Sequence, residues 1–101
     1  MVEAMTWKWY LTIAAVRQYM ALAGLRGELE ETNPDFVRAQ NELGELSLTA
    51  KPARTAETKS GAVIYRGKVT IGGKRRRVEC TVMPIPREEG PLPQLLRVTL
   101  K

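Results

Sequence analysis

Apolar residues in the first half of the chain recur at the spacing of an α-helix. One stripe comprises Ile13, Val16, Met20 and Ala23. Thr12 precedes the stripe as a candidate N-cap, and Gly24 follows it, where a left-handed C-cap residue is expected. The pattern predicts a helix from Thr12 to about Ala23.

A second helix begins at the pair Asn33 and Pro34. Asparagine is a favourable N-cap, and proline suits the first helical position because its missing N–H has no partner there. The expected buried stripe comprises Phe36, Ala39, Leu43 and Leu46. We expect this helix to end near Ala50, with Gly44 either weakening it or permitting close packing on a neighbour.

The segment before the first helix is aromatic. Trp7, Trp9 and Leu11 alternate with more polar residues, which predicts a short strand over residues 7–11. The alternative is one longer helix from about Val2 to Ala23, because periodicity alone does not separate the two.

The second half of the chain alternates at the period of a β-strand. Runs over 63–71 and 74–83 flank Gly72 and Gly73, a two-residue hairpin signal of type I′ or II′. Residues 51–60 precede the hairpin as a polar, basic connector. Residues 84–93 follow it as a turn-rich loop that prolines keep out of a central strand. A last strand alternates Leu96, Val98 and Leu100 with polar residues.

These elements predict one α+β domain over residues 1–101, which is near the usual domain size. The mainly helical half spans 1–50 and the β-meander half spans 61–101. Two N-terminal helices, with or without the preceding short strand, are expected to pack on an antiparallel meander of three to four strands.

The two-residue turn also predicts the register of the hairpin, because residues whose numbers sum to 145 then lie opposite each other. The pairs on one face are apolar or weakly polar: Val63 with Val82, Tyr65 with Cys80, and Gly67 with Val78. A slip by one residue destroys this agreement, so these pairs are expected to face the core.

The opposite face of the hairpin carries charge. Arg66 lies across from Glu79 as a candidate ion pair, whereas Lys68 lies across from Arg77. Like charges directly opposed destabilise a sheet. Nearer the turn even core-side positions become cationic, as in Val69 with Arg76 and Ile71 with Lys74, which predicts a tip that projects beyond the helices.

Charge is distributed unevenly along the chain, whose formal net charge is +5. Residues 1–50 carry four Lys or Arg and seven Asp or Glu, whereas residues 51–77 carry nine Lys or Arg and one Glu. An acidic helical half is therefore joined to a basic strand half.

The composition excludes several kinds of site. The absence of histidine removes histidine metal sites, Ser-His-Asp triads and Cys-His dyads, and one cysteine cannot build a thiolate zinc site. We expect no metal and no cofactor. A lone cysteine, no secretory leader and no apolar run near 20 residues favour a cytoplasmic protein outside the membrane.

The hairpin cations are the candidate site: Arg66, Lys68, Lys74, Arg75, Arg76 and Arg77. One interpretation is a solvated tip that discourages edge-to-edge aggregation. The other is an anion site, because guanidinium groups grip phosphate with two donors. Nucleic acid leads among anions, since a basic stripe binds polyphosphate with release of counterions.

Other residues are assigned to packing or surface. Packing in the core is favoured over base stacking for Trp7, Trp9 and Tyr10. Tyr19 is expected at the surface or its boundary. Cys80 is expected to face the core, with no histidine to activate its thiol.

Four local patterns carry a resemblance to a known family. They are the W-Y-L-T-I-A-A-V-R entry to the first helix, the Y-R-G-K-V lead strand, the G-G-K-R-R-R-V turn and the closing L-L-R-V-T-L strand. With the order of elements, they resemble the RelE-like toxin endoribonucleases and, more loosely, the BrnT-type toxins. The resemblance implies metal-independent RNA cleavage, with Arg66, Lys68, Arg75 and Arg77 as sheet-borne cations. The chain departs from the family in having no tyrosine or histidine near its last strand.

Three hypotheses follow. The first is a nucleic-acid-binding protein, with RNA favoured, that is either a binder or a RelE-like nuclease. The second is a non-enzymatic module, such as a phage-type inhibitor, that docks on an acidic protein; an antitoxin is one such partner. The third is an assembly protein that forms a homodimer through an exposed strand edge.

Overall fold

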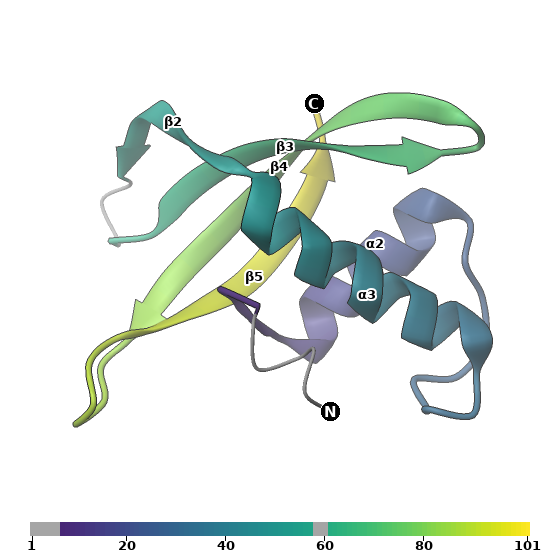
Figure 1. The fold of residues 1–101 in the computed structure, drawn as a ribbon, viewed down its shortest axis with the longest axis horizontal. Helices are drawn as coiled ribbons and strands as arrows, with labels where there is room; N and C mark the ends of the chain where they lie inside the picture. The colour runs from purple at the N-terminus through teal and green to yellow at the C-terminus, as the bar shows by residue number, and fades with distance from the viewer. Residues whose placement is uncertain (1–6, 58–60) are drawn as a thin grey trace.

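The computed structural model describes residues 7–57 and 61–101. Its elements in chain order are β1 (Tyr10–Leu11), α2 (Ile13–Ala23), α3 (Pro34–Thr49), β2 (Lys51–Glu57), β3 (Val63–Ile71), β4 (Lys74–Ile85) and β5 (Leu92–Leu100). Both helices pack on the sheet, and the turn of the β3–β4 hairpin lies above them in the view of Figure 1, on the same side as the start of α3. The predicted α+β class is confirmed.

The sheet has five strands in the order β1-β5-β4-β3-β2. Strands β2 to β5 form an antiparallel meander, while β1 pairs in parallel with β5. The sheet is therefore larger than the predicted three to four strands and mixed in direction. The parallel pair arises because α2 and α3 carry the chain from β1 back across the sheet before the meander begins.

Helix α2 has the predicted bounds and caps. The Thr12 hydroxyl accepts a hydrogen bond from the Ala15 N–H at 3.2 Å, and Gly24 adopts the left-handed conformation with φ of 72°. The predicted stripe was wrong at one end, because Ile13 is 65% exposed. Tyr19, expected near the surface, is fully buried.

Helix α3 also matches its prediction. Asn33 caps it by accepting a hydrogen bond from the Asp35 N–H, and its expected stripe faces the core. Gly44 permits close packing, because a Cβ added there would lie 1.9 Å from the ring of Trp7. Next to it, the Ser47 hydroxyl accepts a hydrogen bond from the Lys8 N–H at 3.0 Å.

The segment before α2 is shorter as a strand than predicted. Only Tyr10 and Leu11 pair with β5, and residues 7–9 are irregular. The alternative helix over 2–23 is wrong for residues 7–12, and its part over 2–6 lies outside the described residues. The short pairing follows from Trp7 leaving the sheet to pack on α3 at Gly44.

The predicted connector over 51–60 was wrong for its first seven residues, which form β2. Lys51 lies opposite Arg66 and Pro52 opposite Tyr65, and the register then shifts before Glu57 meets Val63. An edge strand tolerates polar residues, because one side of the strand faces water. Residues 58–60 lie outside the described part of the chain.

The register of the β3–β4 hairpin is confirmed at every predicted pair, from Val63 with Val82 to Ile71 with Lys74. Gly72 and Gly73 both have positive φ, 59° and 79°, as a type I′ turn requires. The buried side chains of β4 are Val78, Cys80 and Val82, and they contact the helices as one core.

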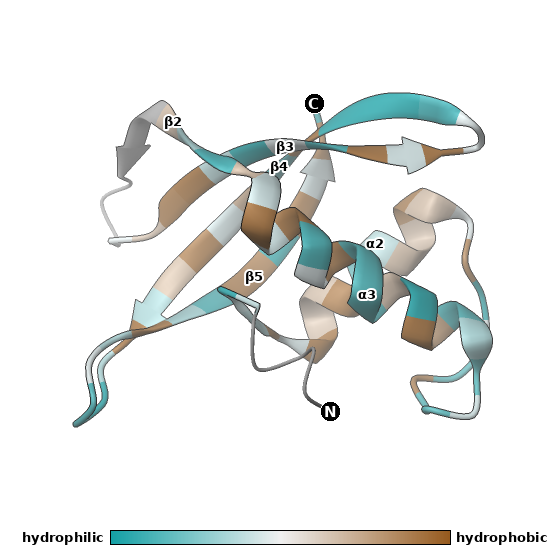
Figure 2. Ribbon diagram, viewed as in Figure 1, coloured by the Kyte–Doolittle hydropathy of each residue, from teal (hydrophilic) through white to brown (hydrophobic). Residues whose placement is uncertain are grey.

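The tip of the hairpin is less detached than predicted. Val69 is buried and Ile71 is partly buried against the core, so the β3 arm rests on the helices almost to the turn. The cations lie on the β4 arm, which is strongly hydrophilic from Lys74 to Arg77 (Figure 2).

The end of the meander differs from the prediction in two respects. Strands β4 and β5 extend into both ends of the predicted loop, with Pro84 opposite Pro93, and residues 86–91 remain a loop. The prolines are tolerated because the pairing of β3 has ended before Pro84 and that of β1 begins only at Gln94. A register shift then lets Leu95 and Val98 both reach the core, so the simple alternation through Leu96 was wrong.

Candidate functional site

Three basic residues lie side by side across the uncovered face of the sheet, and we call them the cationic row: Lys68, Arg77 and Lys101. Lys68 lies directly opposite Arg77 on neighbouring strands. Lys101 continues the line of β5, and its N–H donates to the Arg77 carbonyl at 3.0 Å. The row therefore runs from β3 across β4 to the residue that follows β5.

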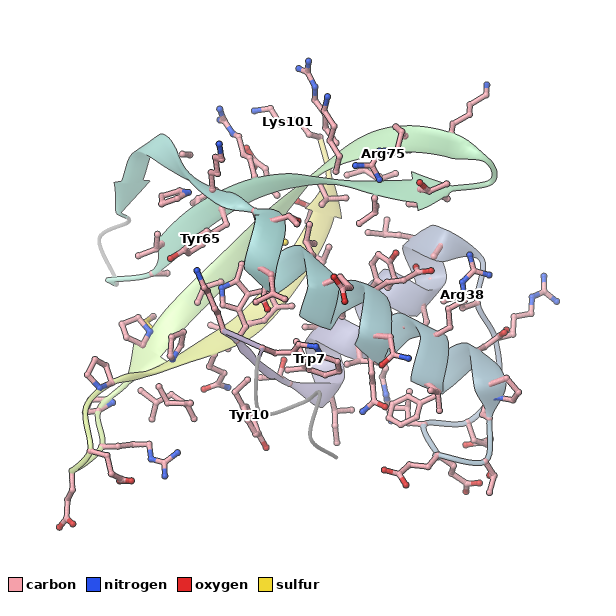
Figure 3. All side chains as sticks on the ribbon, in the orientation of Figure 1. Trp7, Tyr10, Arg38, Tyr65, Arg75 and Lys101 are labelled. Atoms are coloured by element: carbon pink, nitrogen blue, oxygen red, sulfur yellow. The ribbon has the colours of Figure 1, made fainter. Side chains whose placement is uncertain are left out.

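The row borders a shallow depression of about 290 Å³ on this face, which we call the sheet hollow. Its charged lining consists of Arg66 and the cationic row, and Gly67 and Val78 contribute the rest. Figure 3 shows Lys101 at the end of β5, on the side away from the helices. Four cations thus surround one open surface.

A single carboxylate partly balances these charges. The Glu79 carboxylate accepts from Arg66 Nε at 3.0 Å and from Lys101 Nζ at 3.1 Å. These two hydrogen bonds lower the pKa of Glu79 below its usual range. None of the ion pairs formed by the described side chains includes Lys68 or Arg77. The unbalanced charge is concentrated on those two residues.

A second hollow, which we call the cleft, lies between α3 and β3 and has a volume of about 380 Å³. Its lining comes from both helices and the hairpin: Tyr19, Arg38, Asn41, Glu42, Glu45, Leu46, Thr49, Lys68, Val69, Thr70 and Arg75. Lys68 lines both hollows, so the cleft and the sheet hollow are neighbours.

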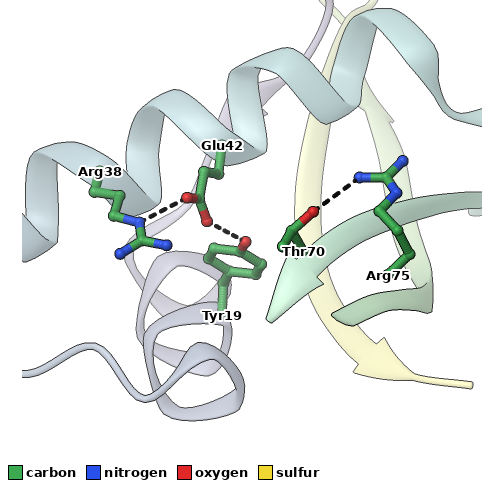
Figure 4. A network of polar contacts seen from close by, with 5 residues as sticks. All are labelled: Tyr19, Arg38, Glu42, Thr70 and Arg75. Carbon is green, nitrogen blue, oxygen red and sulfur yellow. Dashed lines mark hydrogen bonds and ion pairs between the residues drawn. The ribbon is translucent and has the colours of Figure 1, made fainter. Parts of the chain in front are cut away.

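The helix side of the cleft carries a hydrogen-bond network that runs from the buried Tyr19 to the exposed Arg38 (Figure 4). The Tyr19 hydroxyl donates to Glu42, whose other carboxylate oxygen accepts from Arg38 Nε at 2.7 Å. Burial, and then the hydrogen bond to Glu42, raise the pKa of Tyr19 well above its usual range. The phenol stays protonated and fixes the position of the Glu42 carboxylate.

The hairpin side of the cleft carries Thr70 and Arg75, which face Tyr19 and Glu42 in Figure 4. Arg75 Nη1 donates to the Thr70 hydroxyl at 3.3 Å. This neutral partner holds the guanidinium near the cleft without cancelling its charge.

The structure brings together only part of the predicted site. Arg66, Lys68 and Arg77 line the sheet hollow, and Arg75 lines the cleft. Lys74 and Arg76 lie opposite Ile71 and Val69, on the other face of the hairpin, and line neither hollow. The six cations therefore form two groups. Arg66, Lys68, Arg75 and Arg77 lie on one face of the hairpin, and Lys74 and Arg76 lie on the other.

Two basic residues were missed by the prediction. Lys101 joins the row because β5 places it beside Arg77, and Arg38 reaches the cleft from α3. Lys101 could have been found from the sequence, because antiparallel pairing of the last strand with β4 places Leu100 opposite Val78 and so brings Lys101 next to Arg77. Arg38 has no such signal, because its place depends on how α3 lies across the sheet.

The remaining candidates are structural. Trp9 is buried, as predicted, and its ring meets that of Tyr65 edge-on at 5.3 Å. The expected core packing of Tyr10 was wrong, because Tyr10 lies on the edge strand β1 and is 57% exposed. The thiol of Cys80 is fully buried, and burial raises its pKa to about 12. As predicted, the cysteine faces the core, and a protonated thiol is a poor nucleophile.

None of the helices within residues 7–57 and 61–101 is long and apolar enough to cross a membrane. Comparison of the chain with models of protein families, with curated proteins and with solved structures found no match in any of the three.

Proposed function

We propose that the sheet hollow binds the phosphate backbone of a nucleic acid, with RNA favoured by the RelE-like sequence patterns. The cationic row is the observation that carries this proposal. It directs three neighbouring cations, from β3, β4 and the residue after β5, at one open surface, although opposed like charges cost stability. A bound polyanion offsets that repulsion.

The shape of the surface favours a chain of phosphates over one enclosed anion. The sheet hollow is shallow and open, with Lys68 and Arg77 exposed at its border. Binding at such a surface derives its free energy mainly from counterion release and depends steeply on salt. The proposed setting is the cytoplasm, where nucleic acid is present and Cys80 stays reduced.

The proposal is binding rather than RNA cleavage. Cleavage by attack of a ribose hydroxyl needs a group that accepts its proton beside the cations. The Glu79 carboxylate pairs with Lys101 of the row, and its lowered pKa makes it a weak base. The Tyr19 phenol has the opposite property, since its raised pKa keeps it protonated.

Fluorescence anisotropy with a labelled single-stranded RNA tests the proposal. Lys68→Gln and Arg77→Gln are each expected to weaken binding and to reduce the salt slope by roughly 0.7, the value for one lost phosphate contact on a single strand. Arg87→Gln is the matched control, because Arg87 is exposed in the loop after β4 and pairs with Glu89.

Unchanged affinity in both row variants would overturn the proposal. A triple change of Arg75, Arg76 and Arg77 to alanine extends the test to the whole β4 arm. Incubation of the labelled RNA with the protein, with and without chelator, separates a nuclease from a binder. If an acidic protein binds at the row and RNA does not, the docking-module hypothesis replaces this proposal.

A further inference from the structure

The cleft exists because α3 and β3 separate beyond one point of contact. A Cβ added at Gly67 would lie 2.5 Å from Leu46 Cδ1 and 3.2 Å from the Ala50 Cβ, so the end of α3 rests on that glycine. On the other side of Gly67, β2 pairs with β3 only as far as Arg66. From Lys68 to the turn, β3 has no neighbouring strand on its outer side within the described residues.

This stretch of β3 presents backbone groups to the cleft. In an antiparallel hairpin, pairs that exchange hydrogen bonds alternate with pairs that do not. The type I′ turn makes Ile71 and Lys74 an exchanging pair, so Lys68 and Thr70 direct their N–H and C=O groups away from β4. Both residues line the cleft.

The walls of the cleft suit a flat, polar-edged group. Leu46 and Val69 contribute apolar surface, and Asn41 and Glu45 contribute side-chain donors and acceptors from α3. With the free edge of β3, the cleft offers donors and acceptors on two sides of an apolar floor. Its volume, about 380 Å³, suits one small group and not a folded segment.

The geometry points to a base-binding site: we propose that the cleft receives one unpaired base of a single-stranded nucleic acid. This inference rests on the proposed function, since Lys68 lines both hollows and would hold the phosphate of the nucleotide whose base enters the cleft. A base in a duplex has its edge paired and its faces stacked, so it cannot enter. The cleft therefore selects single strands and discriminates among bases.

Binding is measured with labelled homopolymeric single strands of the four bases and with a duplex of equal length. We expect single strands to bind at least about tenfold more tightly than the duplex, and the four bases to differ by about tenfold, the lower range of a good base contact. A cleft variant, Asn41→Ala with Glu45→Gln, is expected to reduce the difference among bases to below about threefold. The matched control is Glu31→Gln, in the exposed loop before α3.

A second measurement follows the backbone amides of Lys68 and Thr70 by NMR hydrogen exchange. Both amides are expected to exchange freely in the unbound protein and to be protected when the preferred single strand is added. Protection by an extended acidic peptide, with none by any oligonucleotide, would identify the cleft as a peptide site and overturn the inference.

The two proposals fail differently. If the Lys68→Gln and Arg77→Gln variants keep full affinity for RNA, the proposed function fails. If those variants lose affinity while the cleft variant keeps its base preference and its preference for single strands, the proposed function stands and the base site is wrong. Equal binding of duplex and single strand by the unmodified protein also contradicts the base site.

Discussion

Lys68 and Arg77 lie directly opposite each other on β3 and β4, and neither takes part in an ion pair with a described side chain. On the same face, the next pair away from the turn is Arg66 with Glu79, which are joined at 3.0 Å. The hairpin therefore contains a matched pair and a repulsive pair side by side. The repulsive pair leaves uncompensated positive charge at an exposed surface.

The first prediction is that Lys68→Glu stabilises the protein and weakens nucleic-acid binding. The change replaces a repulsive pair by an attractive one, so the free energy of unfolding should rise by roughly 0.2–1 kcal/mol. RNA affinity should fall by at least about tenfold, because a phosphate contact becomes a repulsion. Denaturant unfolding and anisotropy measure the two effects.

Arg87→Glu is the control for Lys68→Glu, because it changes the net charge by the same amount in the loop after β4. It should leave stability nearly unchanged and affect RNA binding far less. If both substitutions weaken binding equally, net charge and not the row determines affinity.

The second prediction concerns acid stability through Glu79. Its pKa is lowered in the folded state by Lys101 and Arg66. The stabilisation is therefore complete above the unfolded pKa of about 4.3 and disappears as the pH falls through the lower folded value. The stability difference between the unmodified protein and Glu79→Gln should shrink over that range.

Glu88→Gln provides the comparison for Glu79→Gln, since Glu88 is exposed and belongs to none of the ion pairs found. Its effect on stability should be small at every pH. Glu79→Gln should also raise RNA affinity, because Arg66 and Lys101 lose a competing anion. A stability difference that stays constant down to the lowest pH argues against the ion pairs.

The third prediction concerns the Tyr19 hydroxyl. Tyr19→Phe removes a partly buried hydrogen bond to the Glu42 carboxylate and should cost about 1.5–3 kcal/mol of stability, as for bonds to charged groups. Because the pKa of Tyr19 is raised, alkaline titration of the folded protein should show no tyrosinate from this residue before unfolding. Tyr10→Phe, at a residue 57% exposed, should change stability little.

The fourth prediction concerns the contact between Gly44 and Trp7. Relative to glycine, alanine favours the helical conformation by about 1 kcal/mol. Its Cβ at position 44, however, would lie 1.9 Å from the indole ring of Trp7. The crowding should dominate, so Gly44→Ala should destabilise by about 1–3 kcal/mol. Gly67→Ala should cost less, because the Leu46 side-chain tip that it meets can turn aside.

A double-mutant cycle checks the cause of the Gly44→Ala effect. In a Trp7→Ala background the indole ring is gone, so Gly44→Ala should cost little or become stabilising. An equal cost in both backgrounds would assign the destabilisation to something other than the ring.

The sequence by itself determined the features that depend on neighbours along the chain. The caps of α2 and α3 follow from Thr12, Gly24 and Asn33, whose local hydrogen bonds and dihedral angles need no distant partner. The hairpin register follows from the turn at Gly72 and Gly73, which leaves only one pairing with a consistent apolar face.

Tertiary structure alone decided the features that depend on how distant segments pack. Tyr19 follows Val16 by three residues and lies on the buried side of α2, but the hydrogen bond of its hydroxyl to Glu42 depends on where α3 lies. The strand β2 forms although its residues are polar, because the adjacent edge of β3 offers backbone partners to any sequence.

The candidate site divides in the same way. Lys68 and Arg77 are opposed because of a local turn, so the sequence was enough to find them. Lys101 joins them through the pairing of β4 with β5, and the cleft opens where α3 leaves β3 beyond Gly67. Such long-range packing is set by the shape of the whole core, and a local pattern carries no record of it.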